Sequence, residues 1–463
     1  MKHKKQGGKF VEMAMKSVVC LAGSIMMLGT PAEAQVKVDG GVVTDSATFV
    51  KTGFSFGVLP AVSYDSDLGF QYGLLTNLYW YGDGSKYPQY EHSLYLECSR
   101  YAAGTMLARA YYDSPVLLSG ISDNLRLTAD VTWFRDLLMD FAGFNGRQSV
   151  YNERWTDSDD SEYKTRVFYN HHRTMFRTMA TVRGDIPERH LYWLAGITFF
   201  NMDIEGVHRD ELKRSTPEGV PTLYELYCKY GVIREEEKDG GADAFIRASI
   251  GVDLRDSEAF PTKGVWSEMS VAAAPGFMSK KTDGFLRLTL FHRQYFRLGS
   301  DNRVFAVRLM AQNRIAGRVP FYLLPHITTA TLGSATSQGL GGAKTMRGVA
   351  RNRIVGDGVA MANVEYRWIL KRFQWLGAQW AVGTNIFGDF GITTQDYKVD
   401  MAGVPDEERS MLFRTGDDCI HSSVGMGLKL HFNTNFIVSC DYGKPLRKDD
   451  GTKGLYIQLN YLF

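Results

Sequence analysis

The sequence predicts an all-β protein, a transmembrane antiparallel β-barrel of about 16 strands. Apolar and polar residues alternate through many segments from residue 54 onward, as they do in strands whose two faces meet different surroundings. Aromatic residues make up 13% of the chain, with 47 glycines and only 13 prolines, which is typical of long strands joined by tight turns. In addition, the long connections all follow odd-numbered predicted strands.

The first 34 residues predict an export signal peptide. They begin with a lysine-rich segment, continue with an apolar core at 17–29 that is too short to span a bilayer, and end with an A-x-A cleavage pattern at 32–34. We therefore expect a signal peptide over 1–34, a short periplasmic segment over 35–53 and the barrel over 54–463.

Composition excludes several classes of protein. The formal net charge is +2, and loss of five lysines and two glutamates with the leader brings it to about −1, so electrostatics offer no case for nucleic acid. No later segment contains 18 consecutive apolar residues, which argues against a transmembrane helix. The four cysteines outside the leader are too scattered to indicate a metal site or a disulfide framework.

The predicted strands follow one another along the chain, and a tilted crossing of the membrane needs ~9–11 residues. All are long enough for such a crossing, and several are longer. In order they are 54–64, 68–80, 89–101, 104–113, 124–137, 163–183, 189–203, 243–255, 264–275, 284–297, 302–315, 358–370, 373–390, 420–431, 434–442 and 453–463.

The alternation is clearest in the second half of the chain. Apolar faces run in steps of two over Ile246–Leu254, Leu286–Leu290, Phe305–Leu309, Ala360–Trp368, Val424–Leu430 and Leu455–Phe463. The residues between them include Arg247, Arg287, Arg308, Glu365 and Lys429. An Arg or Lys on the lipid face near the midplane would cost ~2–4 kcal/mol, so the charged faces are expected to line the lumen.

The long connections predict the orientation. They follow odd-numbered strands and lie on one side, as the external loops of outer-membrane barrels do; they are 145–162, 204–242, 316–357 and 391–419. An even strand number places both chain ends in the periplasm. The charged runs at 157–162 and 235–239 predict solvated loops rather than a metal or ligand site.

Several short motifs occur in a definite order. They are Asp253-Leu-Arg-Asp256 with Phe260-Pro-Thr-Lys-Gly264, Met346-Arg347-Gly348-Val349, Glu365 with Arg367, Phe387-Gly388-Asp389-Phe390-Gly391, and the terminal Phe463. This series resembles the signatures of BamA/TamA-type outer-membrane barrels, the bacterial surface antigen family. Val349 stands where that family usually has an aromatic residue. The resemblance spans roughly 240–463.

The resemblance implies a 16-stranded barrel whose sixth external loop folds into the lumen. There Arg347, within the loop motif of Met346, Gly348 and Val349, would pair with Glu365 and Asp389 as a structural latch. Strand parity independently places both carboxylates on inner faces. The remaining site residues implied are the inner-wall charges Asp253, Arg255 and Arg367 and the C-terminal signal Tyr461 and Phe463.

The resemblance also implies a function in the bacterial outer membrane. We expect a barrel-only accessory in protein or lipid insertion or export, in contact with outer-membrane lipid. The region before residue 54 is too short for the periplasmic POTRA domains of such proteins, so a separate periplasmic or lipoprotein partner could supply their function. The first strand contains Gly57 and Pro60, so we also expect weak pairing between the first and last strands.

Two other functions remain to be weighed. A gated pore or passive transporter could use the same scaffold, with the loop 316–357 as its plug. An enzyme is not expected, because His171, His172 and His292 have no serine in a supporting pattern, and no cofactor is indicated. No metal site is expected either, since adjacent histidines on a strand point to opposite faces.

Overall fold

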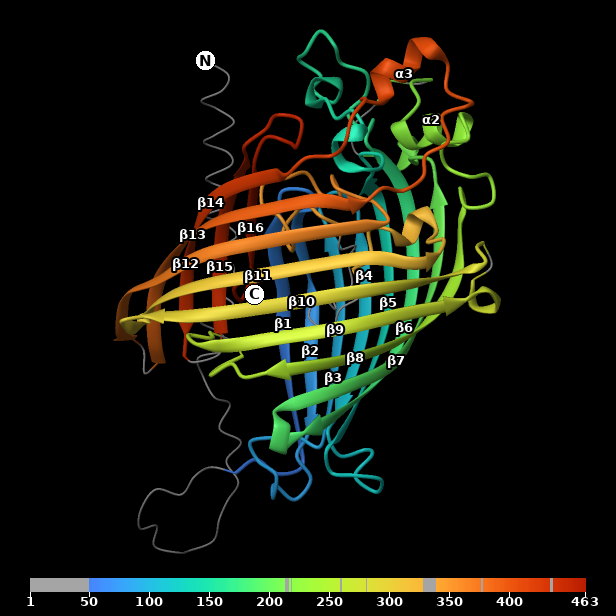
Figure 1. The fold of residues 1–463 in the computed structure, drawn as a ribbon. Coiled ribbons are helices and arrows are strands. Elements are labelled where there is room, and N and C mark those ends of the chain that lie inside the picture. The colour runs from blue at the N-terminus through green and yellow to red at the C-terminus, as the bar shows by residue number, and fades with distance from the viewer. Residues whose placement is uncertain are drawn as a thin grey trace, which may run out of the picture.

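Sixteen antiparallel strands close into a barrel in chain order, and β1 returns to lie beside β16 (Figure 1). This confirms the predicted fold class. The structure is a computed structural model that describes residues 50–463 except 213–215, 218, 259, 280, 328–338, 376–377 and 434–435. The predicted signal peptide and nearly all of the predicted periplasmic segment lie outside the described residues.

The strands are β1 (Phe54–Asp65), β2 (Gly69–Trp80), β3 (His92–Tyr101), β4 (Met106–Ser114), β5 (Leu125–Asp140), β6 (Asn170–Ile186), β7 (Leu191–Glu205), β8 (Gly240–Asp253), β9 (Gly264–Pro275), β10 (Gly284–Leu298), β11 (Ser300–Gly317), β12 (Gly358–Trp375), β13 (Ala378–Gln395), β14 (His421–Phe432), β15 (Phe436–Pro445) and β16 (Gly454–Leu459). Short helical segments lie between them: η1 (Gly146–Gln148), η2 (Glu153–Trp155), η3 (Pro187–Arg189), η4 (Arg209–Glu211), α2 (Leu223–Lys229), η5 (Gly276–Met278), η6 (Phe321–Leu323) and α3 (Asp406–Leu412). Among the described residues, no helix has the length and apolar character needed to cross a membrane.

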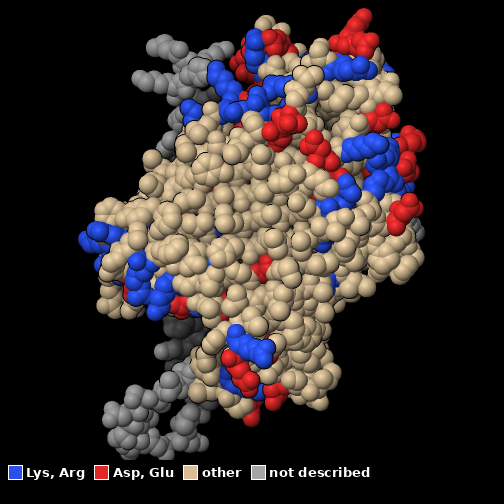
Figure 2. Space-filling model, in the orientation of Figure 1, with Lys and Arg blue, Asp and Glu red and all other residues tan. Residues whose placement is uncertain are grey.

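The two faces of the strands differ in exposure as the alternation predicts. On β14, Met426 and Leu428 are each 63% exposed, whereas Lys429, next to Leu428 on the opposite face, is 1% exposed. On β8, Ile246 and Ile250 are exposed and Arg247 is buried. Figure 2 shows the result from one side: a broad tan surface nearly free of charge, with Lys, Arg, Asp and Glu gathered around its edges. Such a surface is the lipid-facing belt of an outer-membrane barrel.

Most predicted strand limits agree with the structure to within three residues, but four strands differ by more. β12 extends five residues past its predicted end, to Trp375, and β13 is shifted by five residues to Ala378–Gln395. β6 begins at Asn170 rather than at 163, because Phe168 and Tyr169 pack among the loops instead of against a neighbouring strand. β16 ends at Leu459. Asn460 follows with a left-handed φ of 65°, a conformation that ends strand geometry and is better tolerated by Asn than by most residues.

The long external loops pack together into a cap, and α2 and α3 lie at the same end of the barrel in Figure 1. Buried apolar side chains from the loops 141–169, 206–239, 318–357 and 396–420 belong to one cluster. The rings of Phe144 and Tyr397 lie 4.5 Å apart, and those of Tyr227 and Phe413 lie 5.3 Å apart. The prediction of simply solvated loops is therefore wrong for much of their length, because four loops bury one another's aromatic residues.

One of the two charged runs also departs from that prediction. Asp157, Asp159 and Glu162 in the first run are exposed, as expected. In the second, Glu237 is fully buried. Its carboxylate lies 2.6 Å from Arg318 and accepts the backbone N–H of Phe321 at 3.0 Å. Burial raises the pKa of Glu237, although these partners oppose the shift. This carboxylate ties the β7–β8 loop to the first residues of the β11–β12 loop.

Candidate functional site

The β11–β12 loop (residues 318–357, described at 318–327 and 339–357) contacts the charged inner faces of several strands. Its second half turns sharply at three glycines with positive φ: Gly341, Gly342 and Gly348. Met346 and Val349 are buried in an apolar cluster with Leu340, Ile354 and residues of β10, β11 and β12. Apolar side chains thus flank Arg347 on both sides and exclude water from its guanidinium.

Arg347 is fully buried among three carboxylates from three strands. Its Nη1 lies 2.6 Å from Glu365 on β12, and its Nη2 lies 3.0 Å from Asp389 on β13. Both the Nε and the backbone N–H of Arg347 donate to Oδ2 of Asp389, at 3.0 and 2.9 Å. A fork of this kind fixes orientation as well as charge. The two carboxylates expected from the sequence both contact the arginine.

The third carboxylate, Asp441 on β15, was not predicted. It lies 3.4 Å from Nη1 of Arg347 and 2.6 Å from Nζ of Lys429. The ring of Phe387 lies beneath the guanidinium, 3.4 Å from its central carbon. Parity along β15 would have placed Asp441 on the inner face with Ser439 and Gly443. It could not have shown that β15 comes close to the loop.

Gly348 presses the loop against β15. Its φ is +91°, and a Cβ at this position would meet the carbonyl carbon of Gly443 at 2.5 Å. A Cβ on Gly443 would in turn meet the carbonyl oxygen of Arg347 at 2.4 Å. Two glycines are therefore needed for the backbones to touch. The N–H of Gly348 also donates to the Tyr456 hydroxyl of β16 at 3.0 Å.

The remaining predicted charges lie in two places. Arg367 is fully buried beside Glu365, with Nε 2.8 Å from its carboxylate. Asp253 and Arg255 pair with each other at 2.7 Å where β8 ends, at the barrel end opposite the cap. The guanidinium of Arg255 lies over the ring of Trp266 at 4.3 Å. This pair is separate from the Arg347 group.

Tyr461 and Phe463 require a correction. The alternation places them on the lipid face in line with Leu459, but their exposed fractions are only 7% and 5%. After the left-handed Asn460 the chain turns inward. The carbonyl oxygen of Phe463 accepts a hydrogen bond from Arg367 at 2.6 Å, and both rings lie within 5 Å of that guanidinium. These aromatics therefore pack against inner-wall cations, because the left-handed Asn460 redirects the side chains that follow it from the outer face to the inner face.

The barrel closes through a short seam. β1 pairs with β16 only at Tyr64 with Ile457 and at Asp65 with Tyr456, whereas β1 pairs with β2 along its full length from Phe54 to Asp65. Within the described part of the chain, residues 54–63 thus pair with β2 on one side and with no strand on the other. A cavity of about 300 Å³ adjoins this seam and is lined by residues of β1, β2, β16 and the loop, including Lys344 and Gln458.

Comparison with known proteins identifies similar proteins both by sequence and by structure. The sequence profile of the Omp85 superfamily domain matches residues 121–463. Among solved structures, the fold is similar to BamA from Haemophilus ducreyi lacking POTRA domains 1–3, with a TM-score of 0.54 and 15% identity over 89% of this chain and 70% of that one. CdiB from Acinetobacter baumannii gives a TM-score of 0.44 and 11% identity over 89% of this chain and 60% of that one. No curated protein sequence matches the chain.

Proposed function

The chain belongs to the Omp85 superfamily of outer-membrane transport and insertion proteins, and on that premise we propose that it assists the insertion or export of polypeptides at its β1–β16 seam. The observation that carries the proposal is the free edge of β1. Ten of its residues, 54–63, pair with β2 on one side and with no described strand on the other. A free strand edge is a template for another extended chain.

The surroundings of the seam suit this role. Phe54, Phe56 and Val58 are exposed on the outer surface of β1, so an incoming strand would join the sheet within the lipid belt. Side chains rather than backbone hydrogen bonds close most of the gap, since Val62 and Tyr64 pack with Ile457 and Trp380. Separating side chains costs less than breaking a full ladder of buried hydrogen bonds.

The loop would act as the latch of this seam. Arg347 connects β12, β13 and β15, and the Gly348 N–H and Lys344 both reach β16, the latter through a 2.7 Å hydrogen bond to Gln458. The loop thereby holds β16 in place while β1 stays free to part from it. A periplasmic or lipoprotein partner that delivers the polypeptide remains a prediction.

The seam can be tested with a reversible staple. Tyr64 and Ile457 lie opposite each other, so the double variant Tyr64→Cys/Ile457→Cys should form a disulfide across the seam. Cys440 is the partner of Ile457 on β15 and must be replaced by alanine first. The matched control, Val62→Cys/Tyr72→Cys, staples β1 to β2, where pairing is already complete.

The measurement is the folding rate of a urea-unfolded outer-membrane barrel added to liposomes that hold each variant, followed by gel mobility. The parent and the control should accelerate folding. The seam variant should do so only in the presence of reductant. Equal activity of the oxidised seam variant would contradict the proposal. So would a parent that leaves reporter folding unchanged, which is the result expected of a pore or of a barrel that handles lipid alone.

A further inference from the structure

A group of metal-ligand side chains lies at the outer rim, remote from the lumen loop and the seam. His172 and Glu205 are directly opposed residues of the neighbouring strands β6 and β7. Both occupy outward-facing positions, in step with Phe176 and Phe199 of the lipid belt but nearer the external loops. His208 follows Glu205 by three residues, and the start of the β7–β8 loop folds back over His172. Adjacent His171 instead contacts Phe141 and Tyr224.

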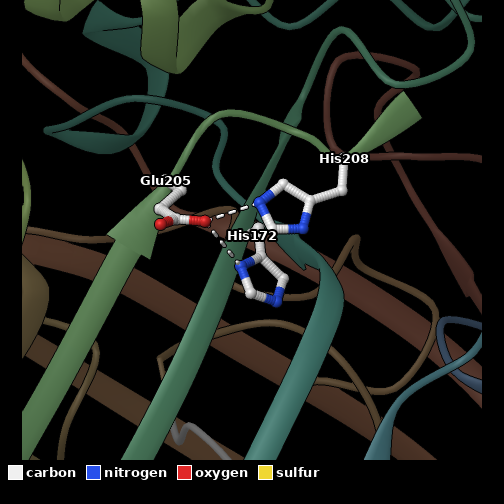
Figure 3. Close-up of side chains that lie close together, drawn as sticks. All are labelled: His172, Glu205 and His208. Atoms are coloured by element: carbon white, nitrogen blue, oxygen red, sulfur yellow. Dashed lines mark hydrogen bonds and ion pairs between the residues drawn. The ribbon is translucent and has the colours of Figure 1, made fainter. Parts of the chain in front are cut away.

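Two ring nitrogens converge on one carboxylate oxygen. His208 Nε2 lies 2.5 Å, and His172 Nδ1 3.7 Å, from Oε2 of Glu205 (Figure 3). The two imidazole rings are stacked, with centroids 4.3 Å apart and planes inclined at 26°. One ligand atom from each of the three residues lies within 4.8 Å of the other two.

His172 is the second observation that points to a ligand. Its side chain is 5% exposed, yet neither of its ring nitrogens has a hydrogen-bond partner among the described residues. A buried polar group without a partner costs about 1–3 kcal/mol. The burial of this imidazole against a carboxylate and a second imidazole is explained if a cation takes up its free lone pair.

The surrounding residues orient His208 for the same purpose. Its Nδ1 lies 3.2 Å from Oε1 of Glu211, and Arg135 on β5 holds that carboxylate oxygen at 2.7 Å. With Nδ1–H donating to Glu211, the lone pair of Nε2 faces Glu205. A carboxylate behind a histidine is the usual outer shell of a metal site.

We propose that His172, Glu205 and His208 bind one divalent transition-metal ion, and that Zn²⁺ is the ion best suited to this set. Two imidazoles and one carboxylate suit zinc, whereas Ca²⁺ and Mg²⁺ prefer oxygen ligands. Glu205 and His208 are 50% and 32% exposed, so a water molecule can complete the coordination from the open side.

Binding of zinc would require only small movements of the three ligand atoms. Zinc bonds of about 2.0–2.1 Å in a tetrahedral site hold neighbouring ligand atoms about 3.3 Å apart. The 3.7 Å separation of His172 and Glu205 would close slightly, and the 2.5 Å separation of Glu205 and His208 would open. Both movements fall on the exposed carboxylate and the loop histidine. The ion would fasten the start of the β7–β8 loop to the barrel wall.

Zinc binding is measured on the purified full chain in detergent micelles, stripped with chelator and titrated with Zn²⁺ by calorimetry. One ion per chain should bind. His208→Ala, a loop variant that should not disturb folding, should weaken binding at least roughly tenfold, and Glu211→Ala by about 10–100-fold. His190→Ala removes an exposed histidine at the opposite end of the barrel and is the matched control.

Two further readouts separate this site from binding elsewhere. Co²⁺ should give a visible spectrum without a thiolate charge-transfer band, since the free thiols Cys98, Cys228, Cys419 and Cys440 take no part. Zinc should also slow proteolysis between 206 and 222 in the parent and not in His208→Ala. The absence of saturable zinc binding would overturn the proposal. Equal affinity of the parent, His208→Ala and Glu211→Ala would overturn it as well.

Discussion

Arg347 shows at the residue scale how charge is accommodated inside this barrel. Its guanidinium, that of Arg367 and the ammonium of Lys429 face the carboxylates of Glu365, Asp389 and Asp441, and all six side chains are fully or almost fully buried. A buried charge is tolerated when opposite charges and hydrogen bonds surround it. The group thus consists of one loop residue and five residues from the four strands β12, β13, β14 and β15, and it depends on each of its members.

Replacement of Arg347 by alanine should destabilise the folded barrel. The variant leaves Glu365 and Asp389 buried without their main cation, and breaking a buried pair from one side costs about 3–5 kcal/mol. We expect a lower temperature for the heat-induced gel shift and new cleavage between 339 and 357. Arg303→Ala, which removes an exposed arginine of β11, is the control. An unchanged melting profile together with an unchanged cleavage pattern would show that Arg347 is not a latch.

At the scale of elements, strands and loops follow different rules. All sixteen strands were predicted, most of them with limits within three residues, because an alternation of two is a local property of the chain. The loops were predicted only in position. Their packing joins residues more than 200 positions apart, as when Arg353 donates to the carbonyl oxygen of Gly146 at 2.6 Å. No pattern within a single loop indicates such a partner.

Asp418 joins two of these loops to a strand end and makes their docking sensitive to acid. It accepts the backbone N–H groups of Arg147 and Thr393 and a hydrogen bond from His421, each at 2.9 Å. Burial alone would raise the pKa of Asp418, but the hydrogen bond and charge of His421, with the two backbone donors, lower it to about 2.

Because this pKa lies below the ordinary value of 3.8, the undocked loops bind more protons than the docked ones as the pH falls. The contribution of Asp418 is complete above about pH 4 and is lost as the pH falls toward 2. Hydrogen exchange of the Arg147 and Thr393 amides should therefore accelerate across this range, after correction for intrinsic rates. Asp418→Asn should remove the dependence. The Gln148 amide, bonded to a backbone carbonyl, is the internal control, and equal behaviour of all three amides would refute the assignment.

For the molecule as a whole, cap, lumen loop and belt define three zones. The belt meets lipid, the loop occupies the interior beside β12, β13 and β15, and the cap covers the external mouth with an aromatic cluster. The loop and the cap therefore both obstruct the path along the barrel axis. An obstructed axis supports the proposed entry of polypeptides at the seam rather than passage along the barrel axis.

Deletion of residues 340–356 should open the axis. The parent should conduct little in planar bilayers, since both the loop and the cap obstruct the lumen. The deletion removes the buried side chains of Met346, Arg347, Val349 and Arg353 and should raise conductance. Deletion of the exposed stretch 157–159 is the control and should leave conductance unchanged. High conductance of the parent, unaffected by the loop deletion, would instead favour the gated-pore alternative.

The sequence by itself determined the strands, their inner and outer faces, the side on which the long loops lie, and the inward direction of Glu365 and Asp389. These follow from period-two alternation, which depends only on neighbouring residues and on the cost of placing charge in lipid. Tertiary structure alone decided that Asp441 joins Arg347, that Tyr461 and Phe463 turn inward, and that the seam predicted to be weakly paired holds β1 and β16 together at two residue pairs. It also brought His172, Glu205 and His208 together. Each of these depends on strand register or on the path of a loop, and both are set by contacts between segments far apart in the chain.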